Sequence, residues 1–122
     1  MNKFIFVSVI LFGFTAMAQN KIEKRCGWIS NPTPANHWIT DAEGTWTIGV
    51  QGGYQAAGIE NINFPASESD KYVRTNGNYG YFCGCLDVET TRTASELLIL
   101  RVYSSQVKTL KVCLEDYTLN AL

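Results

Sequence analysis

The alternation of apolar and polar side chains predicts short β-strands along most of this chain. Trp46, Ile48 and Val50 alternate with small or polar residues, so they fall on one buried face of an extended segment. Residues 79–89 and 96–103 are rich in aromatic and aliphatic side chains, and their closeness in the sequence predicts an antiparallel hairpin. The pattern indicates a mainly β fold: a small antiparallel sheet sandwich or barrel with long loops.

Shorter elements are predicted around these strands. Residues 26–29, 71–75 and 110–114 are each expected to form a brief strand. Residues 34–38 are expected to form one helical turn, because Pro34 suits the first position of a helix. The predicted turns and loops cover residues 41–44, 51–70 and 76–77.

The N-terminus has the pattern of a secretory signal peptide. A short basic start precedes an apolar run over residues 4–14, and a small-x-small cleavage site follows at 16–18. The apolar run is shorter than the roughly 20 residues that a membrane-spanning helix needs. We therefore expect cleavage after Ala18 and export to the periplasm or the medium. The mature chain would begin with a frayed segment, 19–25, followed by a single β domain over 26–122 without a membrane span.

The balance of charge argues against one class of partner. The chain has 10 Lys and Arg residues and 11 Asp and Glu residues, and loss of Lys3 with the signal peptide leaves a formal charge of -2. No basic run is longer than Lys24-Arg25. Nucleic acid is therefore not an expected partner, because its binding needs a basic surface.

Four cysteines predict a disulfide framework that stabilises the domain. An exported chain with an even number of cysteines forms disulfides, here two. Cys83 and Cys85 would lie about 6.6 Å apart on one face of a strand, too far for a bond between them. We expect one of them to bond Cys26 and the other Cys113, with both pairings open. A zinc site is less favoured, because C-x2-C pairs are missing and export favours oxidation. A redox or copper role for the C-x-C pair is also less favoured.

Three ordered motifs are more distinctive than the composition. They are Cys-Gly-Trp at 26–28 leading into Asn-Pro-Thr-Pro-Ala-Asn at 31–36, Trp-Thr-Ile-Gly-Val-Gln-Gly-Gly-Tyr at 46–54, and Thr-Asn-Gly-Asn-Tyr-Gly-Tyr at 75–81 with Cys-Gly-Cys at 83–85. In this order they resemble a family of small exported bacterial proteins catalogued as a domain of unknown function, number 4087. The resemblance covers roughly residues 26–113. It implies a bacterial envelope or secreted protein and supplies no activity, cofactor or catalytic residue.

The sequence contains no recognisable catalytic machinery. His37 is the only histidine, and no nucleophile elbow accompanies it, although Asp41 is near. Gly49, Gly52 and Gly53 predict a bulge or turn, because no Gly-Lys-Ser/Thr follows them. A glycosidase would need two carboxylates across a cleft, whereas the close acidic pairs here are typical of turns and strand ends. Those pairs are Asp41 with Glu43, Glu68 with Asp70, Asp87 with Glu89, and Glu115 with Asp116. We expect no catalytic residue, cofactor or metal site.

Aromatic and amide side chains are the remaining candidates for function. Trp28 and Trp46 are expected in the core, and Tyr79 and Tyr81 are expected to pack on the disulfides. Aromatic faces beside amides suit sugar rings and protein partners alike. The candidate ligand-binding residues are Trp38, Tyr54, Asn36, Gln51 and Asn76.

These observations favour a non-enzymatic exported binding module. Its recognition surface would be the loops 30–44 and 51–70, and its partner another protein, in the manner of an inhibitor, or an envelope glycan. A structural or accessory envelope protein without a soluble ligand is the second hypothesis. An enzyme of unrecognised type is the third. The sequence does not set the ligand or the oligomeric state.

Overall fold

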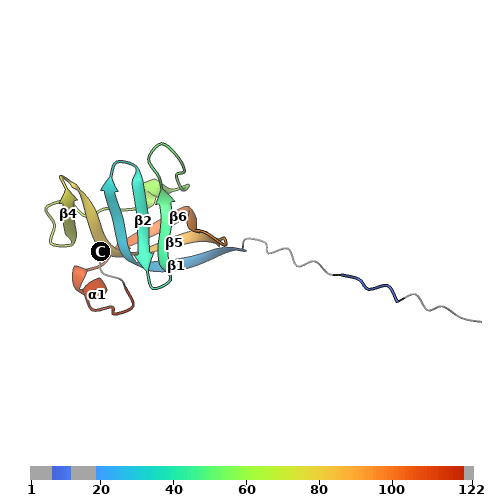
Figure 1. Cartoon of the computed structure of the whole chain (residues 1–122). Coiled ribbons are helices and arrows are strands. Elements are labelled where there is room, and N and C mark those ends of the chain that lie inside the picture. The colour runs from blue at the N-terminus through green and yellow to red at the C-terminus, as the bar shows by residue number, and fades with distance from the viewer. Residues whose placement is uncertain (1–6, 12–18, 120–122) are drawn as a thin grey trace, which may run out of the picture.

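Six strands form one mixed sheet that closes on itself (Figure 1). The computed structural model describes residues 7–11 and 19–119 of the chain. Its elements are β1 (Gln19–Thr33), β2 (Asn36–Asp41), β3 (Gly44–Gly49), the 3-10 helix η1 (Ile59–Asn61), β4 (Tyr72–Asn76), β5 (Tyr79–Arg92), β6 (Leu97–Val107) and α1 (Leu110–Leu114). The strand order is β1-β2-β3-β6-β5-β4, and a further pairing of β1 with β5 closes five strands into a ring. The prediction of a small, mainly β barrel is confirmed.

The sheet is not wholly antiparallel. Every strand pair is antiparallel except β3 with β6, which run parallel where Thr47 lies opposite Leu98. The segment after β3 closes the gap between these two strands. The Ala56 amide donates to Ile48 O at 2.8 Å, and the Val102 amide donates to Ala57 O at 2.8 Å. A loop segment therefore satisfies backbone groups that a continuous strand pair would otherwise satisfy.

β1 is much longer than the four-residue strand that the sequence predicted. Its residues 19–31 pair one by one with residues 80–92 of β5, in reverse order. The expectation that residues 19–25 are frayed is therefore wrong, because β5 provides partners for their backbone groups. Their polar composition agrees with their exposure, since most of these side chains, including Ile22 at 76%, face solvent.

The barrel interior holds one continuous apolar core. All of the strands of the ring contribute, together with the segment that follows β3. The buried members are Ile29, Ile39, Trp46, Ile48, Ala56, Ile62, Phe82, Leu86, Val88, Ile99 and Val102. The predicted buried face of β3 is confirmed for Trp46 and Ile48, whereas Val50 is 46% exposed. Val50 leaves the face because β3 ends at Gly49 and the chain turns there.

Charged side chains close one end of the barrel around Trp46. The guanidinium groups of Arg25 and Arg92 lie 4.6 and 4.7 Å from the centre of the Trp46 ring. Arg25 Nε donates to Asp41 at 2.6 Å, and Trp46 Nε1 donates to the same carboxylate at 3.2 Å. Asp41, expected in a solvated turn, is the buried last residue of β2, and the turn follows it. Glu43, in this turn, pairs with Arg92 at 2.7 Å.

Both predicted disulfides form, and the pairing is now defined. Cys26 bonds Cys85, directly opposite it on β5, and Cys83 bonds Cys113 in α1. The second bond holds the C-terminal segment over Trp28, which is buried under Cys113 and packs edge to face with Tyr81. Figure 1 shows α1 beside the end of the sheet that carries β4, away from the start of β1.

Residues 110–114 form one helical turn rather than the predicted strand. β5 is paired with β1 on one edge and with β6 and β4 on the other, so no edge of β5 is left for a further strand. A segment bonded to Cys83 must therefore lie above the sheet.

Residues 34–38 also differ from their prediction. Residues 34–35 form a tight turn, with Ala35 at φ 61°, and β2 begins at Asn36. The amide nitrogen of Asn31 donates to Thr33 O and Asn36 O, both at 2.8 Å, and so favours a turn over a helix. The brief strand predicted near 71–75 is confirmed as β4. The turn predicted at 76–77 falls one residue later, at Gly77-Asn78, because Asn76 still pairs with Tyr79 as the last residue of β4.

The expected signal peptide lies mostly outside the described residues, including its cleavage site at 16–18. Within residues 7–11 and 19–119, no helix has the length and apolar character that crossing a membrane requires.

Candidate functional site

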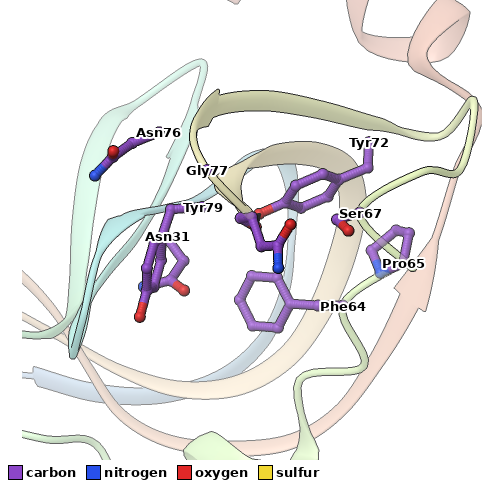
Figure 2. A pocket seen from close by; sticks show the side chains of 9 residues that line it. Asn31, Phe64, Pro65, Ser67, Tyr72, Asn76, Gly77 and Tyr79 are labelled. Atoms are coloured by element: carbon purple, nitrogen blue, oxygen red, sulfur yellow. Dashed lines mark hydrogen bonds between the residues drawn. The ribbon is translucent and has the colours of Figure 1, made fainter.

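A groove of about 640 Å³ opens where the β4–β5 hairpin meets the loop that precedes β4 (Figure 2). Its volume is within the range typical of small-molecule sites, roughly 300–1,000 Å³. The lining residues come from β1, from the loop, and from the hairpin. They are Asn31, Phe64, Pro65, Ser67, Tyr72, Asn76, Gly77, Asn78 and Tyr79.

Phe64 joins the groove to the barrel core. Its ring packs edge to face on Phe82, with 5.2 Å between the ring centroids. The ring of His37 lies on another side of Phe64, with the centroids 5.8 Å apart. Phe82 is fully buried, so Phe64 is supported from beneath by the core. The groove is therefore at the mouth of the barrel, a common place for ligand sites in β-barrels.

Two tyrosines stand on opposite sides of the groove. Figure 2 shows Tyr72 on the side of Ser67 and Pro65, and Tyr79 beside Asn31 on the other side. The Tyr72 hydroxyl donates to the backbone oxygen of Asn78 at 3.0 Å, which ties β4 to the hairpin turn. Burial raises the pKa of Tyr72 above its ordinary value, so this hydroxyl stays protonated at neutral pH.

Three amide side chains line the groove together with the aromatic rings. Asn31 uses its nitrogen to hold the β1–β2 turn, which leaves its side-chain oxygen as an acceptor. Asn76 and Asn78 are exposed, and among residues 19–119 neither side-chain amide finds a hydrogen-bond partner. Each of these two amides can therefore donate and accept a hydrogen bond with a ligand.

The hairpin geometry depends on two glycines. Gly77 has φ 57°, a left-handed conformation that glycine adopts without strain. At Gly80, a side-chain Cβ would overlap the carbonyl oxygen of Val73 on β4. Glycine at position 80 thus allows β4 to pair closely with β5, which places Tyr72 and Tyr79 around the groove.

None of the nine lining side chains is charged. Arg74, on β4, is directed to the turn, where its Nε donates to Gly77 O at 3.0 Å. Glu68, next to Ser67, accepts a hydrogen bond from the Ser67 hydroxyl at 3.0 Å. The groove consequently offers neutral donors, neutral acceptors and aromatic surface.

One of the five candidate ligand-binding residues, Asn76, lines the groove. Asn36 and Gln51 lie together outside the lining, since the Gln51 backbone N–H donates to Asn36 Oδ1 at 2.8 Å. The backbone oxygen of Asn36 accepts from the Asn31 side chain. Trp38, on β2, lies opposite Ser30 and Thr47 in the sheet and is outside the lining.

Tyr54 is likewise outside the lining of the groove. Its side chain is 39% exposed, and its hydroxyl donates to Ile99 O at 2.7 Å, which holds the post-β3 loop on β6.

Sequence reasoning missed several residues of the groove. Asn78 lies in the hairpin turn and Tyr79 follows it, and their amide and aromatic character was the available signal. Phe64 lies in a loop without periodicity, and Asn31 lies near prolines that argued against a strand. Their positions depend on contacts between distant parts of the chain, which the local pattern does not contain.

The arrangement around His37 does not form a catalytic dyad. His37 is half-buried on β2, not in the helical turn expected for 34–38, and its Nδ1 is buried without a hydrogen-bond partner in the described structure. Burial lowers the pKa of His37 below its ordinary value of 6.5. Asp41 is engaged by Arg25 and Trp46 at the charged end of the barrel. Among residues 7–11 and 19–119, no group of three or more His, Cys, Asp or Glu could hold a metal ion.

Comparison with known proteins assigns this fold to a family. The chain belongs to the family described as Protein of unknown function (DUF4087), which matches residues 20–120. The match includes the complete lining of the groove and all four cysteines. Neither the curated proteins nor the solved structures give a significant match to the chain.

Proposed function

We propose that this protein is an exported, non-enzymatic binding module, and that the groove at the barrel mouth is its recognition surface. The observation that carries the proposal is the groove itself, in which the Asn76 and Asn78 side chains, which make no hydrogen bond within residues 19–119, stand beside aromatic rings. Exposed polar groups that the fold does not use are available to a ligand. The groove replaces the broader loop surface that the sequence favoured, although Phe64, Pro65 and Ser67 belong to the 51–70 loop.

Rigidity supports a binding role. The disulfide Cys26–Cys85 joins β1 to β5, the two strands that lead to the groove, and Phe64 is fixed on the core. A preformed site loses little conformational entropy when it binds, which favours affinity. The two disulfides and the N-terminal signal pattern support export, because disulfides persist in oxidising compartments.

The experiment is capture of ligands by the purified oxidised protein. The bait meets solubilised cell envelope and culture supernatant, and bound protein and glycan are both identified by mass spectrometry. We expect a saturable ligand that an Asn76→Ala, Asn78→Ala double variant no longer captures. These side chains are exposed and make no bonds in the described structure, so the variant should keep its melting temperature.

A Gln51→Ala variant is the matched control. Gln51 is an exposed amide outside the groove, and only its backbone makes the bond to Asn36. The Gln51→Ala control should capture the same ligand as the wild-type protein does. Equal capture by all three proteins would show that the recognition surface lies elsewhere, and no saturable ligand for wild type would contradict the binding role.

A further inference from the structure

We infer that the ligand of the groove is an uncharged oligosaccharide, whose sugar rings pack on Tyr72 and Tyr79 while its hydroxyls bond the surrounding amides. This inference rests on the proposed function and names the chemical class of its ligand. It follows from three properties of the lining: its aromatic surface, its hydrogen-bonding groups and its lack of charge.

The aromatic surface suits the C–H faces of sugar rings. Tyr72 and Tyr79 are each half-buried, so part of each ring remains accessible from the groove. Phe64 adds an apolar floor that is anchored to Phe82. A sugar ring has an apolar face and a polar edge, and an aromatic ring next to polar groups complements both.

The hydrogen-bonding groups suit hydroxyls in particular. A sugar hydroxyl both donates and accepts, and it therefore needs partners of both kinds. The amides of Asn76 and Asn78 each supply a donor and an acceptor, and Asn31 supplies an acceptor. These three amides come from β1 and the β4–β5 hairpin, so they can bond different edges of a ligand at the same time.

The lack of charge distinguishes among ligand classes. An anionic glycan, a nucleotide or a peptide carboxylate would need a nearby cation, because burying an unpaired charge is costly. Arg74, the cation of β4, is outside the lining and uses its Nε to bond Gly77 O. The carboxylate of Glu68, which is bonded to Ser67, would repel an anion at that side of the groove. Hot spots for protein partners are enriched in Trp, Tyr and Arg, and of these three the lining has only its two tyrosines.

The test uses a printed array of neutral and anionic oligosaccharides, probed with labelled, oxidised full-length protein. The strongest neutral hit is then titrated by calorimetry against wild type and variants. We expect neutral glycans to bind, anionic glycans of equal length to bind no better, and Tyr79→Ala to weaken binding at least tenfold. Tyr103→Ala is the control, because Tyr103 is 45% exposed on β6 and lies outside the groove lining.

Folding must be separated from recognition. Tyr79 is half-buried, so the thermal melt of Tyr79→Ala is measured, and the Asn76→Ala, Asn78→Ala double variant gives a second measure of affinity without disturbing the fold. The inference is overturned if no neutral glycan binds, if only anionic glycans bind, or if neither groove variant weakens binding. If the array is blank but capture yields a groove-dependent protein, the ligand class is wrong and the binding role stands. If neither the array nor the capture experiment yields a ligand, the ligand class and the binding role are both contradicted.

Discussion

The ring of Phe64 stands edge to face on the ring of Phe82, and this contact joins the floor of the groove to the core of the barrel. Phe82 is fully buried on β5, whereas Phe64 comes from a loop and is half-buried. One aromatic contact therefore couples the position of a loop to the packing of the sheet. The recognition surface should be as rigid as the barrel itself.

Shortening Phe64 should destabilise the protein. Phe64→Ala removes the contact with Phe82 and leaves a void at the barrel mouth. We expect the free energy of unfolding to fall by about 2 kcal/mol, less than for a fully buried phenylalanine, because Phe64 is half-buried. Phe64→Leu keeps most of the volume and should cost less than about 1.5 kcal/mol. Urea unfolding measures both, and equal stability of wild type and Phe64→Ala would show that the loop is not anchored here.

Glycine at position 80 should be essential to the hairpin. In Gly80→Ala the new Cβ would overlap the Val73 carbonyl, so β4 must move away from β5. We expect a loss of about 2–3 kcal/mol in the free energy of unfolding, and loss of ligand binding with it. Gly53→Ala is the matched control, since the nearest atom to its Cβ would be 3.8 Å away. A Gly80→Ala protein as stable as Gly53→Ala would contradict the pairing of these strands.

Arg25 should contribute more to stability than its neighbour Lys24. Arg25→Ala leaves Asp41, a 5% exposed carboxylate, without its ion-pair partner and uncovers one face of Trp46. We expect a loss of about 3 kcal/mol. Lys24 pairs with Asp87 at 3.4 Å, but both side chains are over 40% exposed, so Lys24→Ala should cost less than about 1 kcal/mol. Similar losses for the two variants in urea unfolding would contradict the account of the charged end.

Acid should weaken the fold in two steps. Burial lowers the pKa of His37 below 6.5, although the carbonyl of Ala35 opposes this. The unfolded chain then takes up a proton more readily than the folded chain, and stability falls as the pH drops below about 6.5. The hydrogen bond from Arg92 holds the pKa of Glu43 below 4.5, so stability from this carboxylate is lost as the pH falls below about 4.5.

The His37→Gln variant separates the two steps. Its melting temperature should change less than that of wild type between pH 7 and pH 5, while the loss below about pH 4.5 should remain. Thermal melts across this pH range make the comparison. Parallel curves for wild type and variant above pH 5 would show that His37 is not the group responsible.

Local sequence patterns predicted those elements whose conformation depends mainly on residues that are close in the sequence. The alternation at Trp46 and Ile48 located β3, and Asn76-Gly77 located the hairpin turn to within one residue. The two-residue spacing of Cys83 and Cys85 excluded a bond between them. It could not choose their partners, because that choice depends on the register that sets Cys26 opposite Cys85.

The remaining errors of prediction arise where the conformation of a segment depends on contacts with residues that are distant in the sequence. Residues 19–25 are polar, yet they form a strand because β5 extends far enough to pair with them. The groove combines Asn31, Phe64 and the β4–β5 hairpin, which are remote in sequence. Asn76 was found because it belongs to a recognisable Asn-Gly turn signal at the end of β4, whereas Phe64 has no local signal.

The most direct measurement of the central claim is amide chemical-shift mapping by NMR, with the captured ligand added to isotope-labelled protein. The account predicts that the perturbed amides cluster at Asn31, at residues 64–67 and along 72–79, with Trp38 and residues 51–54 unchanged. Shifts centred on Trp38 and Tyr54, or spread evenly over the barrel, would contradict the assignment of the groove as the recognition site.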